Sequence, residues 1–121
     1  MNAREVTLNL PPDRTLLRVV RLAASGLASD LGFTVRELDD LALAVDELTL
    51  ALMEVARSDI SLSLRADGMG VSVRGSAGTG GTIELSDLAT SILTSACDLY
   101  EIGQGMSGPF FSMVKVRENI D

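Results

Sequence analysis

The sequence predicts a two-layer α+β sandwich in which helices cover one face of a mostly antiparallel sheet. Three observations carry this prediction: segments that alternate polar and apolar residues, segments with apolar residues every three or four positions, and a hairpin between two alternating segments. The order strand, helix, helix, hairpin, loop, helix, hairpin suits helices packed on one side of a sheet. With 121 residues and 46% hydrophobic content, residues 1–121 are expected to form one domain.

The first strand is predicted over residues 5–10, where valine and leucine alternate with polar residues until two prolines end the strand. Asp13 can then cap a helix, because its carboxylate can accept hydrogen bonds from backbone N–H groups that lack a helical partner. Apolar residues recur at helical spacing up to a stop at Gly32. The opposite side of this helix is either a solvated face or a contact patch for an acidic partner, and it carries Arg14, Arg18 and Arg21.

A second helix begins at Thr34, because Thr34 and Glu37 form a capping box that satisfies two backbone N–H groups. Apolar residues recur every three or four positions and form its core stripe, and the helix is predicted to run to about Arg57. A neighbouring stripe mixes acidic and apolar residues, so we expect it to face a cleft, another helix or a subunit. The core stripe is Leu38, Leu41, Val45, Leu48, Leu52 and Val55, and the mixed stripe is Asp40, Leu43, Glu47, Ala51 and Glu54.

The second half of the chain predicts two hairpins with a helix between them. Residues 60–64 and 71–73 are two segments in which apolar and polar residues alternate. Residues 65–70 between them are predicted to form a turn that needs glycine at positive φ. Residues 75–81 are all small and are expected to form a flexible loop. A third helix capped by Ser86 or Asp87, with Leu88, Ile92, Leu93, Ala96 and Leu99 on its inner side, precedes a strand at 100–102, a turn at 103–108 and a strand at 110–117.

Composition excludes several classes of function. The formal charge of −7 disfavours direct binding to nucleic acid or to anionic membranes. The chain has no histidine, so it cannot form a Ser-His-Asp or Cys-His catalytic pair or a Cys/His zinc site, and no metal site is expected. Cys97, the one cysteine, is expected to be a buried small hydrophobe. No run reaches the ~18 apolar residues of a membrane helix and no secretion signal is recognisable, so we expect a soluble cytoplasmic protein.

Two segments are candidates for chemistry. Asp46 and Glu47 could act as a general base or a magnesium ligand, but adjacent helical residues point ~100° apart, so only one of them can face a cleft. The glycine-rich residues 75–81 precede a helix and could cradle a phosphate, although they contain no lysine and lack P-loop spacing. A mobile surface loop is the alternative interpretation. Gly68 and Gly70 lie between two strands and are explained by a tight turn.

The run LALAVDELT at residues 41–49, followed by a hairpin, a glycine-rich loop and a helix that leads into CDLYEI at 97–102, resembles the serine-kinase anti-sigma factors. These proteins belong to the histidine-kinase-like (GHKL, Bergerat-fold) ATPases. The resemblance covers nearly the whole chain and implies one GHKL ATPase-like domain over residues 1–121. It also implies that Glu47 stands at the position of the kinase base.

Departures from the family pattern imply that the ATP site is lost. Ala51 stands where the family has an asparagine that binds the magnesium of the nucleotide, and a methyl group cannot coordinate a cation. Gly75 stands where the family has an aspartate that reads adenine, and Ala77 and Thr79 stand at two glycine positions. We therefore expect no bound cofactor, and Glu47 as a vestigial base.

Two later motifs depart from the family as well. The nucleotide lid is reduced to residues 78–85, and Asp87 and Ala89 stand at its two glycine positions. The late Gly-Thr motif reads Gly-Pro-Phe at residues 108–110, so the resemblance places the Phe110 ring where a threonine helps to hold adenine.

By resemblance, the chain is an anti-sigma factor that forms a homodimer, sequesters a sigma factor and is countered by an anti-anti-sigma partner of the STAS type. The resemblance places a partner-binding arginine at Arg18, flanked by Arg14 and Arg21. The acidic charge balance agrees, because it attracts the basic promoter-reading surface of a sigma factor. Two alternatives remain open: an active serine kinase that uses ATP, magnesium and Glu47 to phosphorylate its antagonist, and a dimeric interaction module outside sigma control.

Overall fold

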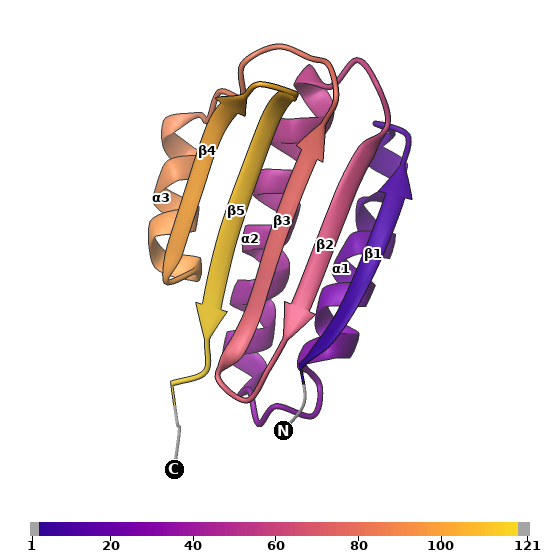
Figure 1. Ribbon diagram of the computed structural model, residues 1–121. Helices are drawn as coiled ribbons and strands as arrows, with labels where there is room; N and C mark the ends of the chain where they lie inside the picture. The colour runs from indigo at the N-terminus through magenta and orange to yellow at the C-terminus, as the bar shows by residue number, and fades with distance from the viewer. Residues whose placement is uncertain (1–2, 119–121) are drawn as a thin grey trace.

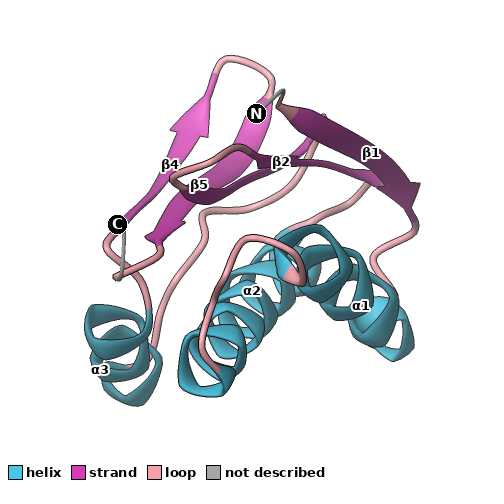
Figure 2. Cartoon of the chain, turned by 90° about the horizontal axis from the view of Figure 1, so that it is seen from below, coloured by secondary structure: helices cyan, strands magenta, loops and turns pink. Residues whose placement is uncertain are grey.

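The computed structural model describes residues 3–118 and has two layers, a five-stranded sheet and three α-helices on one of its faces (Figures 1 and 2). The strand order is β1-β2-β3-β5-β4, and every neighbouring pair is antiparallel. The predicted fold class is confirmed. The elements are β1 (Arg4–Leu10), the 3-10 turn η1 (Arg14–Leu16), α1 (Leu17–Ala28), α2 (Val35–Val55), β2 (Ile60–Ala66), β3 (Gly70–Ala77), α3 (Asp87–Ala96), β4 (Leu99–Gly105) and β5 (Gly108–Val116).

Side-chain caps open the helices where the sequence predicts them. The Asp13 carboxylate accepts a hydrogen bond from the backbone N–H two residues on, at 2.9 Å, and starts the turn that leads into α1. The capping box of α2 is complete, because Glu37 N–H donates to Thr34 Oγ1 at 3.1 Å and Thr34 N–H donates to Glu37 Oε1 at 2.8 Å. Of the two candidates at the start of α3, Ser86 is the cap and Asp87 is the first helical residue.

The helices end slightly before their predicted stops. α1 ends at Ala28, and the chain reverses farther on through Gly32, which has a φ of +80°. α2 ends at Val55 rather than at Arg57. Within residues 3–118, no helix has both the length and the apolar character that crossing a membrane requires.

The core lies between α2 and the middle of the sheet. Phe111 of β5 is fully buried, and it packs over Gly75 of β3, where any side chain would collide with the phenyl ring. The core stripe of α2 faces this layer as predicted, fully buried at its centre and half-buried at its two ends. Its fully buried members are Leu41, Val45, Leu48 and Leu52, and its half-buried members are Leu38 and Val55.

The turn between β2 and β3 corrects one expectation. Neither Gly68 nor Gly70 has a positive φ. The Asp67 carboxylate shapes the turn instead, because it accepts hydrogen bonds from the backbone N–H groups of Met69 at 2.8 Å and Gly70 at 3.2 Å. Gly70 is needed for a different reason, since a side chain there would collide with the backbone of Lys115 on the adjacent strand β5.

The prediction of a flexible loop at residues 75–81 is wrong. The first three of these residues are the end of β3 and pair with β2, and Gly75 and Ser76 also pair with β5. The remainder is hydrogen-bonded to the end of α2 and the segment after it, because Gly81 N–H donates to the Val55 carbonyl and Arg57 N–H donates to the Thr79 carbonyl, both at 2.9 Å. Small residues occur here because the chain passes close to the core and to α2, which local sequence does not reveal.

The predicted inner side of α3 is confirmed for the buried Leu93 and Ala96 and for the half-buried Ile92, and it is wrong for Leu88 and Leu99. Leu88 is 71% exposed, and Leu99, which begins β4, is 69% exposed. The buried residues of α3 are Ala89, Leu93 and Ala96, so its buried stripe is narrower and consists mainly of small residues. Helical spacing alone did not distinguish this stripe from the one beside it.

Candidate functional site

A groove of about 260 Å³ lies between α2 and the segment that leads into α3. Its floor includes the buried Ala51 and Ala89, and its rim carries three carboxylates. Glu47 and Glu54 are two turns apart on one side of α2, and Glu84 comes from the segment before α3. The prediction that the mixed stripe of α2 faces a cleft is therefore confirmed for this part of the stripe. The full lining is Glu47, Leu50, Ala51, Glu54, Glu84, Leu85, Ser86 and Ala89.

Asp46 and Glu47 point to different sides of α2, as their helical offset predicts. Asp46 lies on the side of α1, where its carboxylate oxygens are 3.2 Å from Arg21 Nε. Burial raises the pKa of Asp46, and the positive charge of Arg21 opposes that rise. Glu47 lines the groove. Of the two candidate bases, Glu47 is therefore the one that a molecule in the groove could reach.

The residues of this groove do not fit a magnesium nucleotide. A triphosphate is polyanionic and needs cationic groups or N–H donors around it, whereas the lining holds three glutamates and no lysine, arginine or asparagine. Ala51, one turn after Glu47, offers no ligand atom to a cation. Asp87 adds negative charge in the first turn of α3, where a helix end would otherwise favour a phosphate. In the described part of the chain, no three acidic or cysteine side chains form a cluster that could hold a metal ion.

The phosphate cradle proposed for residues 75–81 is not formed. Gly75 and Ala77 are buried on the helix-facing side of β3. Thr79 is exposed, but its backbone N–H donates to Ser58 Oγ at 3.2 Å. The amides of Thr79 and Gly81 are thus used within the chain, and residues 82–86 separate this segment from α3.

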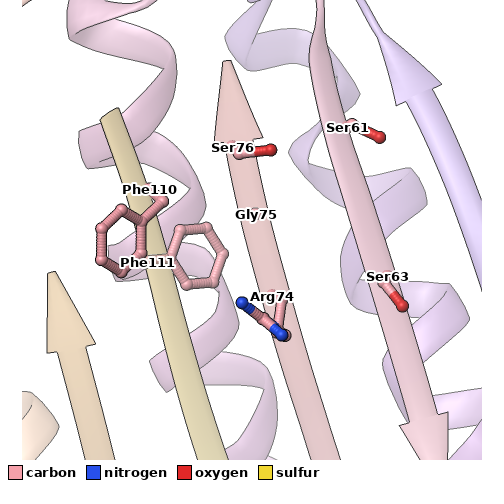
Figure 3. A pocket seen from close by; sticks show the side chains of 7 residues that line it. All are labelled: Ser61, Ser63, Arg74, Gly75, Ser76, Phe110 and Phe111. Carbon is pink, nitrogen blue, oxygen red and sulfur yellow. The ribbon is translucent and has the colours of Figure 1, made fainter. Parts of the chain in front are cut away.

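Phe110 lies on the opposite side of the sheet from this groove. β5 alternates, so that Phe111 faces the helices while the Phe110 ring lies over Gly103 of β4 on the open face (Figure 3). The Phe110 ring therefore does not line the groove beside α2. A shallow hollow of about 280 Å³ beside it is lined by Ser61, Ser63, Arg74, Gly75, Ser76, Phe110 and Phe111.

The three predicted partner-binding arginines have different surroundings. Arg21 is held by Asp46 across the α1–α2 contact. Arg14 lies beside the second half of α2, where it lines a small hollow. Arg18 is exposed, and its Nε donates to the Thr15 carbonyl at 3.3 Å. Within residues 3–118, neither Arg14 nor Arg18 forms an ion pair, so these two charges are available to a partner.

Leu22 extends this arginine surface and was missed at the level of sequence. It lies one turn after Arg18 on α1 and is 70% exposed. The signal was present, because Leu22 is an apolar residue outside the core stripe of an amphipathic helix. Together Arg18 and Leu22 present a cation beside an aliphatic side chain, a combination that suits a protein interface.

The sheet order and the helices on one face define a two-layer α+β fold with a groove beside α2. The chain is similar to a solved structure, that of the RsbU and RsbW domains of Rv1364c from Mycobacterium tuberculosis, with a TM-score of 0.75 and 12% identity. The match covers 96% of this chain and 33% of that one, so this chain spans about a third of its length. The likeness is one of fold. No family model matches the sequence, and no curated protein matches it.

Proposed function

We propose that the chain is an anti-sigma factor-like regulator that sequesters a sigma factor and works without ATP. The observation that carries this proposal is the groove beside α2, whose lining holds Glu47 together with two other carboxylates and Ala51 and lacks nucleotide ligands. The resemblance assigns Glu47 the position of the kinase base. The shared fold with a chain that contains an RsbW domain, of the anti-sigma and GHKL-like kinase class, supports the assignment. In this proposal residues 1–121 act as one domain of that class.

The partner surface in this proposal is the outer side of α1. Arg14 and Arg18 supply charges without an ion pair in the described chain, and Leu22 supplies an apolar contact beside them. Such a surface suits an acidic partner, as expected for the STAS antagonist. The remaining surface is strongly acidic, since the whole chain has a formal net charge of −7. It attracts the basic surface of a sigma factor and raises the rate of association.

Release of the sigma factor in this proposal depends on competition. A chain that does not bind ATP cannot phosphorylate its antagonist, so partner exchange follows the relative affinities and amounts of the two partners. Glu47 in the groove is the observation that favours the alternative, an active serine kinase. Titration with ATP and magnesium separates these two functions.

The partner surface is tested by Arg18→Glu in a pull-down with identification of the captured proteins. The wild-type chain is expected to retain a sigma factor or a STAS protein, and Arg18→Glu is expected to lose the STAS protein, because the substitution reverses an exposed charge at that contact. The melting temperature should stay nearly unchanged, since an exposed charge contributes little to stability. Arg36→Glu is the matched control, because Arg36 is an exposed arginine at the start of α2. Equal capture by both variants would reject α1 as the partner surface.

A further inference from the structure

The face of the sheet that the helices leave open has a hollow between a cation and an aromatic ring (Figure 3). Two adjacent rows of cross-strand neighbours surround this hollow. One row is Ser63 and Arg74, and the other is Ser61, Ser76 and Phe110. The three serines are short, whereas the arginine and the phenylalanine are long, so a hollow of about 280 Å³ remains open over the serines.

Arg74 is an exposed cation that forms no ion pair within residues 3–118. The two acidic residues that the strands place on this face do not compensate its charge. Glu5 pairs with Arg65 at 3.8 Å and contacts the hollow only as the acceptor of a long, 3.4 Å hydrogen bond from Ser63. Glu101 lies two strands away, about 10 Å at the usual strand spacing and thus about one Debye length. In a chain with a formal net charge of −7, the hollow is therefore a local site of positive charge.

The lining of the hollow offers hydrogen-bond donors and no carboxylate. The guanidinium of Arg74 is a planar fork that can donate to two oxygens of one anion. The hydroxyls of Ser61 and Ser76, at facing positions of β2 and β3, can donate to a third oxygen. A phosphate monoester presents three terminal oxygens and a charge of about −1.5 to −2 at pH 7, so it uses all of these donors. A carboxylate has only two oxygens, which Arg74 alone can pair.

Phe110 adds an apolar contact at the rim of the hollow. It is half-buried on a face that no helix covers, and its ring lies over Gly103 of β4, where a side chain would collide with the ring. Because the ring leans toward β4, the space above Ser76 stays open (Figure 3). An aromatic ring at the rim favours a ligand that has an apolar group beside its phosphate. The volume of about 280 Å³ is at the small end for ligand pockets, which suits a small ligand.

We propose that this hollow binds a small phosphate monoester whose ester group is apolar. Arg74 pairs with the phosphate, and the hydroxyls of Ser61 and Ser76 donate to its third oxygen. Phe110 contacts the ester group. The hollow lies on the opposite side of the sheet from the groove beside α2, so it is a second and separate site. This inference depends neither on the proposed sigma-factor partner nor on the loss of ATP binding in the groove.

Nitrogen-15 NMR titration of the chain of residues 1–121 tests the inference, with phenyl phosphate as the probe at pH 7.5. Saturable chemical-shift changes are expected at the backbone N–H groups of Gly75 and Ser76, which line the hollow. Inorganic phosphate should shift the same signals but bind at least about threefold more weakly, because it lacks the ring. Phenol, which lacks the phosphate, should cause no saturable shift at these two groups.

Two variants remove the proposed contacts. Arg74→Gln should raise the dissociation constant for phenyl phosphate at least about tenfold, because it removes the charge that pairs with the phosphate. Ser76→Val should have a similar effect, since it fills the hollow and removes a hydroxyl, while valine suits a strand. The matched controls are Arg36→Gln, at an exposed arginine that starts α2, and Ser72→Val, on the same face of β3 but outside the hollow. Both controls should bind phenyl phosphate as tightly as the wild type does.

The same spectra show whether each variant is folded. A wild-type chain without saturable shifts at Gly75 and Ser76 up to about 20 mM phenyl phosphate would overturn the inference. So would a dissociation constant that Arg74→Gln leaves unchanged, since the anion would then bind elsewhere. Equal affinities for phenyl phosphate and inorganic phosphate would reject the apolar ester group, because Phe110 would then contribute nothing to binding.

Discussion

Glu37 joins the start of α2 to the segment that follows β5, and its substitution by glutamine should destabilise the fold in a pH-dependent way. The side chain is 3% exposed. Its Oε1 accepts from Thr34 N–H at 2.8 Å, and its Oε2 accepts from Glu118 N–H at 2.7 Å. These contacts lower the pKa of Glu37, with the Thr34 hydrogen bond as the largest cause and the Lys115 charge as a smaller one, while burial acts in the opposite direction.

The expected loss for Glu37→Gln follows from these two contacts. Glutamine keeps one acceptor oxygen but presents an NH₂ group to the other N–H, so one charge-assisted hydrogen bond is lost and a buried donor loses its acceptor. A hydrogen bond to an ionised group contributes ~1.5 to 3 kcal/mol, so the free energy of unfolding should fall by about 2 kcal/mol at pH 7. Because the folded-state pKa lies below the ordinary value of 4.5, this stabilisation is fully present above that value. It disappears as the pH falls through the lowered pKa.

Urea unfolding of the wild type and Glu37→Gln between pH 3 and pH 7 measures this effect. The difference between the two proteins should be largest at neutral pH and should shrink at the acid end. Glu84→Gln is the control, since Glu84 is exposed at the groove rim, and it should change stability by less than ~0.5 kcal/mol. A Glu37→Gln protein as stable as the wild type at pH 7, or a difference that does not change with pH, would refute this account of Glu37.

Two further predictions concern the core. Leu48→Ala should cost ~2 to 5 kcal/mol in urea unfolding, because Leu48 is fully buried between α2 and the sheet, whereas Leu88→Ala on the exposed side of α3 should cost less than ~0.5 kcal/mol. Equal losses would mean that the buried faces are misassigned. Cys97 should react slowly with iodoacetamide at pH 8 in the native chain and much faster in urea, because burial is the main cause that raises the pKa of its thiol, and the thiol donates to the Leu93 carbonyl. Equal rates in the native and unfolded chain would contradict its burial.

The parts of the fold that could be predicted from sequence are those that local residues determine. The caps at Asp13 and Thr34 depend on side chains within three residues of the helix start, so the sequence contains the whole signal. The alternation of β2 and the core stripe of α2 are equally local. Gly75 was wrongly assigned to a loop. A glycine is needed there because the ring of Phe111, from a strand far along the chain, leaves no room for a side chain. Such pairing depends on tertiary structure and leaves no local pattern.

In the candidate site, too, some features could be predicted from local sequence and others depend on tertiary packing. The mixed stripe of α2 predicted a cleft-facing side for Glu47, and helical geometry alone separated it from Asp46. Glu84 was not predicted, because it comes from a segment without regular structure whose position depends on how α3 packs. Arg21 belonged to the predicted arginine face, but its ion pair with Asp46 depends on the packing of α1 against α2.

Calorimetric titration of the chain of residues 1–121 with ATP and magnesium tests the central claim most directly. The three glutamates of the groove and the alanine at position 51 predict no measurable heat and no shift in melting temperature. Nucleotide binding would appear as stabilisation, since a ligand at a hundred times its dissociation constant contributes ~2.7 kcal/mol. Micromolar binding with such a shift would contradict the proposal that the groove no longer accepts a nucleotide, and would return Glu47 to the role of a catalytic base.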